Sequence, residues 1–140
     1  MINDEELTKY MTLIEQYKDQ MNQLELQSQY VNAAITDYSK AKMTVEKLNN
    51  LETGSEILLP IGGSTFINAT TNDTSKVLFD IGAGIITEKK SEDAIKKIDK
   101  RIEDLQKTQE KLIQMIQNIQ AETSEIYSKA QKLMEKKESQ

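Results

Sequence analysis

The chain has 140 residues with no cysteine and no histidine, and its 23 acidic residues outnumber the 18 basic ones to give a net charge of −5. The missing thiols and imidazoles exclude disulfides, the usual zinc ligands and imidazole-based catalysis, so we expect no enzyme activity, no cofactor and no metal. The acidic balance argues against nucleic acid, and 37% hydrophobic content with mean hydropathy −0.61 favours thin paired helices over a thick core.

The first ten residues, MINDEELTKY, are polar and acidic. They lack the basic and apolar regions of a signal peptide, and no run in the chain approaches the length of a membrane span. We therefore expect a cytoplasmic protein without a membrane partner.

The first predicted element is a helix over residues 5–51 whose apolar positions step alternately by three and four, as in a coiled-coil heptad. The seam positions are Leu7, Tyr10, Ile14, Tyr17, Met21, Leu24, Ser28, Val31, Ile35 and Tyr38. Near Lys42 the seam is expected to shift phase, as a local stutter would produce. The shifted positions are Ala41, Val45, Leu48 and Leu51.

Residues 52–91 lose the helical period and form a turn-rich insert that contains every glycine, the only proline and both phenylalanines. Four short strands are predicted at residues 56–60, 64–70, 76–81 and 84–88, paired as two β-hairpins. The glycines at residues 62–63 and 82–84 are interpreted as tight turns that need positive φ. A phosphate-binding loop would be followed by a helix with the P-loop lysine, and neither turn is. Asp80 is expected to face outward towards a lysine.

Both faces of these hairpins carry apolar residues, which one small sheet cannot bury, and an isolated hairpin is marginal in water. We therefore predict pairing with strands of other subunits, closing an intersubunit β-barrel. The predicted oligomerisation residues are Ile57, Leu59, Ile61, Phe66, Ile67, Val77, Leu78, Phe79, Ile81 and Ile85.

The second predicted helix covers residues 92–138 and keeps one heptad phase throughout. Its seam is Ile95, Ile98, Ile102, Leu105, Gln109, Leu112, Ile116, Ile119, Thr123, Ile126, Ala130 and Leu133. The polar Gln109 and Thr123 are interpreted as register-setting positions. Arms of nearly equal length around one insert predict a mainly α, single-subunit fold over residues 1–140. Its core would be a long antiparallel two-helix coiled coil with the two hairpins at the hinge end.

The insert resembles that of the prefoldin alpha family, with a Leu-Pro-x-Gly-Gly-like first turn and a Val-Leu-x-x-x-Gly-x-Gly second turn. The matching residues are Leu58, Leu59, Pro60, Ile61, Gly62 and Gly63, then Asn72, Asp73, Thr74, Lys76, Val77, Leu78, Ile81, Gly82, Gly84, Glu88 and Lys89. The resemblance implies a hexamer of two alpha and four beta subunits joined through a double β-barrel. It also implies ATP-independent capture of unfolded proteins and their delivery to a group II chaperonin.

In the family, client contacts lie at the tips of the coiled-coil arms. Transferred by position, these contacts would lie near Ile2, Leu7, Met11, Leu133 and Met134. Fraying of the last turns is expected to expose Tyr10 and Ile126 as well, which completes the predicted client-binding set. No loop caps the seam at that end, and flexible thioethers accommodate many client shapes. Two alternatives stay open from the sequence: a coiled-coil spacer or scaffold that holds partners at a distance, and self-assembly without beta subunits.

Overall fold

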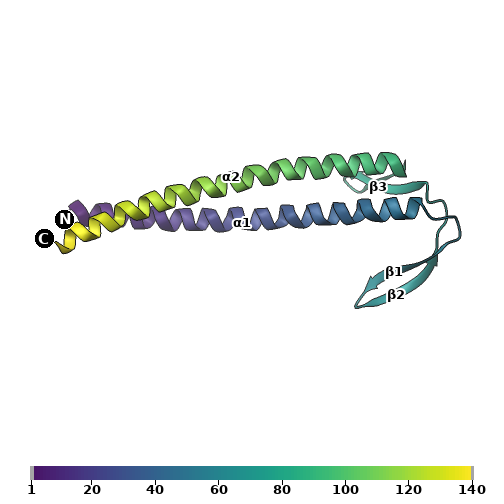
Figure 1. Ribbon diagram of the computed structural model, residues 1–140, viewed down its shortest axis with the longest axis horizontal. Coiled ribbons are helices and arrows are strands. Elements are labelled where there is room, and N and C mark those ends of the chain that lie inside the picture. Colours follow the sequence, from purple (N-terminus) through teal and green to yellow (C-terminus); the bar gives the residue numbers. More distant parts are fainter. Residues whose placement is uncertain (1, 140) are drawn as a thin grey trace. The chain divides into compact units, whose positions relative to one another are not determined.

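The computed structural model describes the backbone of residues 2–139 and the side chains of residues 4–139 (Figure 1). Two long helices flank two small antiparallel hairpins in chain order, which confirms the mainly α fold class predicted from the heptads. The elements in chain order are α1 (Ile2–Asn49), β1 (Glu56–Gly62), β2 (Thr65–Thr70), β3 (Lys76–Gly82), β4 (Ile85–Lys90) and α2 (Ser91–Glu138). Each predicted element boundary lies within three residues of its observed position.

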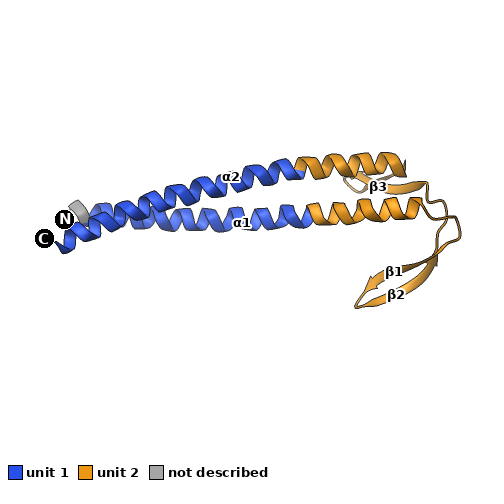
Figure 2. Ribbon diagram, in the orientation of Figure 1, with its two compact units in different colours: residues 1–34, 105–140 blue, residues 35–104 orange. Residues whose placement is uncertain are grey.

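The chain divides into two compact units, coloured blue and orange in Figure 2. The first contains residues 1–34 and 105–140, and the second contains residues 35–104. Within the described residues, neither helix has a stretch long and apolar enough to cross a lipid bilayer.

In the first unit the two helix segments lie antiparallel, with the chain ends close together: the Lys137 ammonium pairs with the Asp4 carboxylate. All predicted seam residues of this unit are buried or half-buried, and Leu24, Leu112 and Ala130 are the most buried among them. The heptad reading therefore identified the contact face of both segments correctly.

The second unit has a small core where Phe79 of β3 meets Ala94 and Ile98 of α2. Tyr38, Val77 and Ile102 pack around this cluster. Hairpin β3–β4 is therefore attached to the helix pair through one face of β3.

The predicted phase shift near Lys42 is confirmed only in part: Val45 and Leu48 are half-buried as predicted, but the other two predicted positions are not. Ala41 and Leu51 are exposed, whereas Lys42 is half-buried, so the three-and-four spacing continues from Tyr38 through Lys42. A lysine can occupy a seam position because its stem packs on apolar surface while its ammonium reaches a partner. Here Nζ lies 2.7 Å from Oδ1 of Asp99 on the opposite helix. The hydrogen bond to Asp99, opposed by partial burial, raises the pKa of Lys42.

The two hairpins have the same construction, 20 positions apart in the chain. In the first, Gly62 pairs with Thr65 after a bulge at Ile61; in the second, Gly82 pairs with Ile85 after a bulge at Ile81. Both connecting residues of each loop have positive φ, as type I′ turns require. Asp80 is exposed, as predicted, but the predicted pairing with a lysine is wrong. Its carboxylate instead accepts a hydrogen bond from the Gly82 N–H (2.8 Å).

Buried hydroxyls fasten the bases of the hairpins. The Thr71 hydroxyl donates to the Glu52 carbonyl (2.9 Å) and accepts from the Ser55 N–H (3.0 Å). Ser91, the first residue of α2, donates through its hydroxyl to the Thr74 carbonyl (2.9 Å). The chain therefore enters and leaves the insert through hydrogen-bonded turns.

We expect Gly82→Ala to destabilise hairpin β3–β4 by about 1–2 kcal/mol, because φ at Gly82 is +124°, a conformation that disfavours any Cβ. Apart from Gly82 and its two chain neighbours, no described residue has an atom within 4 Å of the added Cβ, so the cost is conformational. Thermal unfolding and amide exchange of β3–β4 measure it. The matched variant Ala83→Gly should be neutral or stabilising because φ at Ala83 is +52°. Wild-type stability of Gly82→Ala would contradict the turn assignment.

Candidate functional site

The described side chains, residues 4–139, contain no cluster of three or more carboxylates that could hold a metal. The candidate surfaces described below are the two apolar ones to which the residues predicted from the sequence belong. One lies in the first unit where both helices end, and the other lies on the hairpins of the second unit.

At the helix ends, four predicted client-binding residues lie in the seam and two lie beside it. Leu7, Tyr10, Ile126 and Leu133 are half-buried between the helices. Met11 and Met134 are exposed, at 56% and 51%. The side chain of Ile2, also predicted as a client contact, lies outside the described residues. The structure thus combines a partly covered seam with two accessible thioethers.

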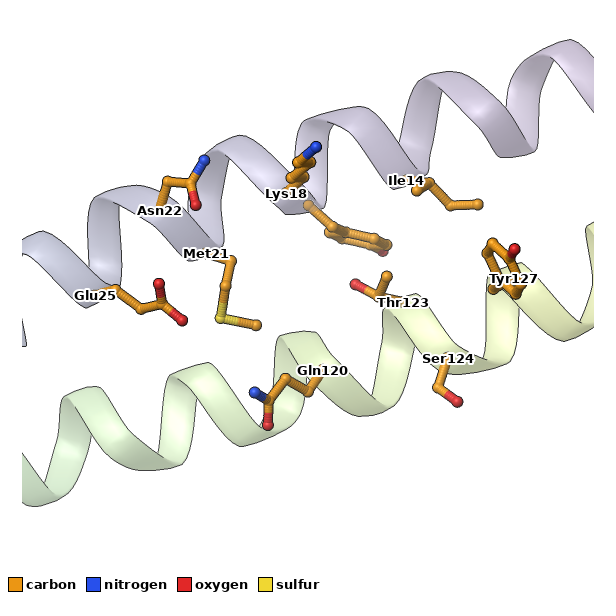
Figure 3. Close-up of a pocket in the computed structure, with 10 residues that line it drawn as sticks. Ile14, Lys18, Met21, Asn22, Glu25, Gln120, Thr123, Ser124 and Tyr127 are labelled. Carbon is orange, nitrogen blue, oxygen red and sulfur yellow. The ribbon is translucent and has the colours of Figure 1, made fainter.

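Two adjoining grooves continue this surface along the first unit. The first is lined by Leu7, Met11 and Ile14 of α1, together with polar neighbours. The second, about 440 Å³ in volume, lies between the helices and is shown in Figure 3. There Met21 of α1 and Thr123 of α2 point into the space between the helices.

The second groove exists because Thr123 is a small residue in a seam of larger ones. Tyr17 and Tyr127 also line it. Partial burial, followed by interaction with Glu122, raises the pKa of the Tyr17 hydroxyl. The sequence contained a signal for this groove, because Thr123 is a polar residue in an apolar heptad seam. From the sequence alone, that signal is interpreted as a register-setting position. The Thr123 hydroxyl instead donates to the Ile119 carbonyl of its own helix (2.7 Å).

The other polar seam residue does cross between helices. Gln109 Nε2 donates to the Ser28 hydroxyl at 2.7 Å. The oxygen of the same amide, Gln109 Oε1, is buried without a hydrogen-bond partner. Ser28 was the only polar residue in the first predicted seam. The two polar residues therefore form one layer in an otherwise apolar contact.

On the hairpins, most of the predicted oligomerisation residues are exposed. The exposed ones are Leu59, Ile61, Phe66, Ile67, Leu78, Ile81 and Ile85. Phe79 is different: it is 9% exposed and lies in the subunit's own core, with the half-buried Val77 beside it. Alternation along β3 turns these two side chains towards the helices and Leu78 away from them.

Two further exposed residues, Leu58 and Ile86, belong to this surface and were missed. The repeat of the two hairpins could have identified Leu58, because it occupies the same position as Leu78. Ile86 pairs with Asp80 across the second hairpin. The hairpins thus present open strand edges and apolar faces that nothing in the described chain covers.

Two long helices with heptad seams, separated in the chain by two β-hairpins, define a class of coiled-coil proteins with a hairpin insert. A family model described as prefoldin subunit matches residues 17–136. The chain belongs to the prefoldin subunit family.

The relatives agree with the resemblance to the alpha type. The chain is 30% identical to the prefoldin subunit alpha of Methanococcus aeolicus over 134 residues, covering 96% of this chain and 88% of the relative. It is 24% identical to that of Archaeoglobus fulgidus over 90% of this chain and 92% of the relative. A cryo-EM structure of filamentous PFD from Methanocaldococcus jannaschii has a similar fold, with a TM-score of 0.61, 23% identity and coverage of 90% of this chain and 98% of that one.

The polar layer leads to a test of the seam. Ser28→Ala leaves Gln109 Nε2 without its partner and should cost about 1–3 kcal/mol, whereas Ser28→Ala combined with Gln109→Leu removes both polar groups and should be at least as stable as wild type. Urea unfolding followed by helical circular dichroism measures both. The exposed Gln106→Leu is the matched control and should change stability by less than about 0.5 kcal/mol. A double variant that is no more stable than Ser28→Ala alone would contradict a shared polar layer.

Proposed function

We propose that this chain is the alpha subunit of an ATP-independent holding chaperone. In this proposal it assembles with prefoldin beta subunits, two alpha with four beta, in the cytoplasm. Its helix ends bind unfolded proteins and the complex delivers them to a group II chaperonin. The observation that carries the proposal is the pair of exposed methionines beside the open end of the seam.

An unfolded client offers apolar side chains in no fixed arrangement, so its binding surface needs apolar area that can change shape. Met11 and Met134 provide this because a thioether chain has three rotatable bonds and no branched carbon. The adjoining groove lined by Leu7, Met11 and Ile14 extends the apolar surface beyond the two methionines. A client side chain buried there gains on the order of 1.5–3 kcal/mol, which suits weak, reversible holding.

The hairpins support the assembly part of the proposal. Each hairpin is a two-stranded sheet, so both of its strands have an outer edge that pairs with no other strand of the described chain. At least one apolar face is uncovered as well, exemplified by Leu58 and Phe66 on β1–β2. Open edges invite pairing with another chain, and natural proteins cover them. Strands from other prefoldin subunits would supply both the missing hydrogen bonds and the missing apolar contacts.

The combined substitution Met11→Ser and Met134→Ser should weaken client holding, because it removes the exposed apolar area at the helix ends. We expect the amount of complex needed for half-suppression of aggregation of a denatured protein to rise roughly two- to five-fold. The measurement is light scattering with the chain assembled with a prefoldin beta subunit.

Met43→Ser is the matched control: Met43 is 54% exposed, close to the values for Met11 and Met134, but belongs to the second unit. It should leave holding unchanged, and native mass should show that all variants assemble equally. Equal holding by wild type and the double variant, or equal loss in Met43→Ser, would refute client binding at the helix ends. Failure of the wild-type chain to join a beta subunit would refute the assembly.

A second candidate is a structural spacer that self-assembles through the same hairpins. It is favoured by the shared construction of the two hairpins, which makes their edges mutually compatible, and a protein of similar fold is described as filamentous. A spacer should retain one folded partner tightly, whereas a holding chaperone should retain many denatured ones weakly. Pull-downs with folded and denatured proteins distinguish the two.

A further inference from the structure

Arg101 of α2 makes three kinds of contact with the elements around hairpin β3–β4. Its guanidinium carbon lies 4.8 Å from the centre of the Phe79 ring and 5.6 Å from that of Tyr38. Nη1 donates to the Tyr38 hydroxyl (3.1 Å) and Nη2 donates to the Asp80 carbonyl (3.3 Å). One side chain therefore connects α1, α2 and β3.

Arg101 is also the only arginine among the 18 basic residues of the chain. A lysine could supply the charge but not this geometry, because an ammonium is a compact, strongly hydrated point charge. A guanidinium is planar and more weakly hydrated, so it can lie against aromatic rings while its separate N–H groups reach two acceptors. The one arginine thus occupies a position whose contacts use those properties.

The position of these contacts within the hairpin matters. Phe79 and Val77 fix the first half of β3 to the core, and Asp80 is the last residue of β3 before the bulge. Arg101 therefore extends the attachment from the root of the hairpin to its turn. The opposite face of the hairpin, which contains Leu78 and Ile86, stays exposed.

Hairpin β1–β2 provides an internal comparison, because it has the same register. Leu59 occupies the position that corresponds to Phe79 and is 42% exposed, against 9% for Phe79. A leucine also has no ring face for a cation. Two hairpins of equal local construction therefore differ in whether the chain's own helices hold them.

We propose that Arg101 is the positioning residue that fixes hairpin β3–β4 on the helix pair before assembly. Its outward face is then presented to a neighbouring subunit in a defined orientation, whereas β1–β2 is fixed only when that subunit binds. The role in assembly rests on the proposed function above; the attachment of the hairpin does not.

The test is Arg101→Lys in the full-length chain, with hydrogen exchange measured before and after mixing with a prefoldin beta subunit. In the free chain, amides of β3–β4 should exchange about tenfold faster than in wild type, because the ring contacts and the fork of donors are lost. Amides of β1–β2 should not change. The concentration of beta subunit needed for half-assembly should rise at least severalfold.

Lys100→Ala is the matched control: it removes a neighbouring cation whose Nζ lies 3.3 Å from Asp104 on the same helix, and it should change neither readout. Tyr38→Phe keeps the ring but removes one acceptor and should give an intermediate effect, which guards against a general loss of folding in Arg101→Lys.

Wild-type exchange of β3–β4 in Arg101→Lys would refute the attachment. Faster exchange with unchanged assembly would refute the role of Arg101 in assembly, and a wild-type chain that binds no beta subunit would refute the proposed function without affecting the exchange result.

Discussion

The apolar seam between the helices is one layer deep. The rest of the structure depends on the small apolar area that such a seam can bury. Paired helices bury one stripe each and leave their outer faces to water. A hairpin can therefore join the core only where residues such as Ala94 and Ile98 leave room for it, and in the described chain that site takes Phe79. The remaining apolar surface of the two hairpins has no layer of its own to pack against in the described chain, which favours the proposed association with other chains.

Two polar pairs across the seam favour one register of the helices. Two apolar helices could slide past one another by a heptad at modest cost, but a polar pair is matched in one alignment only. Each unit has such a pair across the helices: Gln109 with Ser28 in the first, and Lys42 with Asp99 in the second. The unpartnered Gln109 Oε1 indicates that the first pair is a compromise between alignment and stability.

The sequence predicted the parts of the fold that depend on local spacing. Heptads identified both helices, and the turn glycines located both hairpins to within a few residues. The phase near Lys42 was misread because a lysine counts as polar in a heptad, whereas its burial depends on Asp99, which lies far away in the chain. The different burial of Phe79 and Leu59 could not be predicted either, because both strands have the same local pattern and the difference comes from contacts with α2. The groove at Thr123 could not be predicted from the sequence either, because it depends on which side chains of α1 face Thr123 across the seam.

In the proposed function, the two candidate surfaces need opposite mechanical properties, and their residues differ accordingly. A strand from another subunit must meet a backbone edge of defined register, so the hairpin that receives it gains from being held rigidly, as the planar and doubly hydrogen-bonded Arg101 can do. An unfolded client has no register, so its binding surface gains from side chains with many rotamers, such as Met11 and Met134. Exchanging the two strategies would weaken both tasks: a rigid tip would select among clients, and a mobile hairpin would lose conformational entropy at each assembly step.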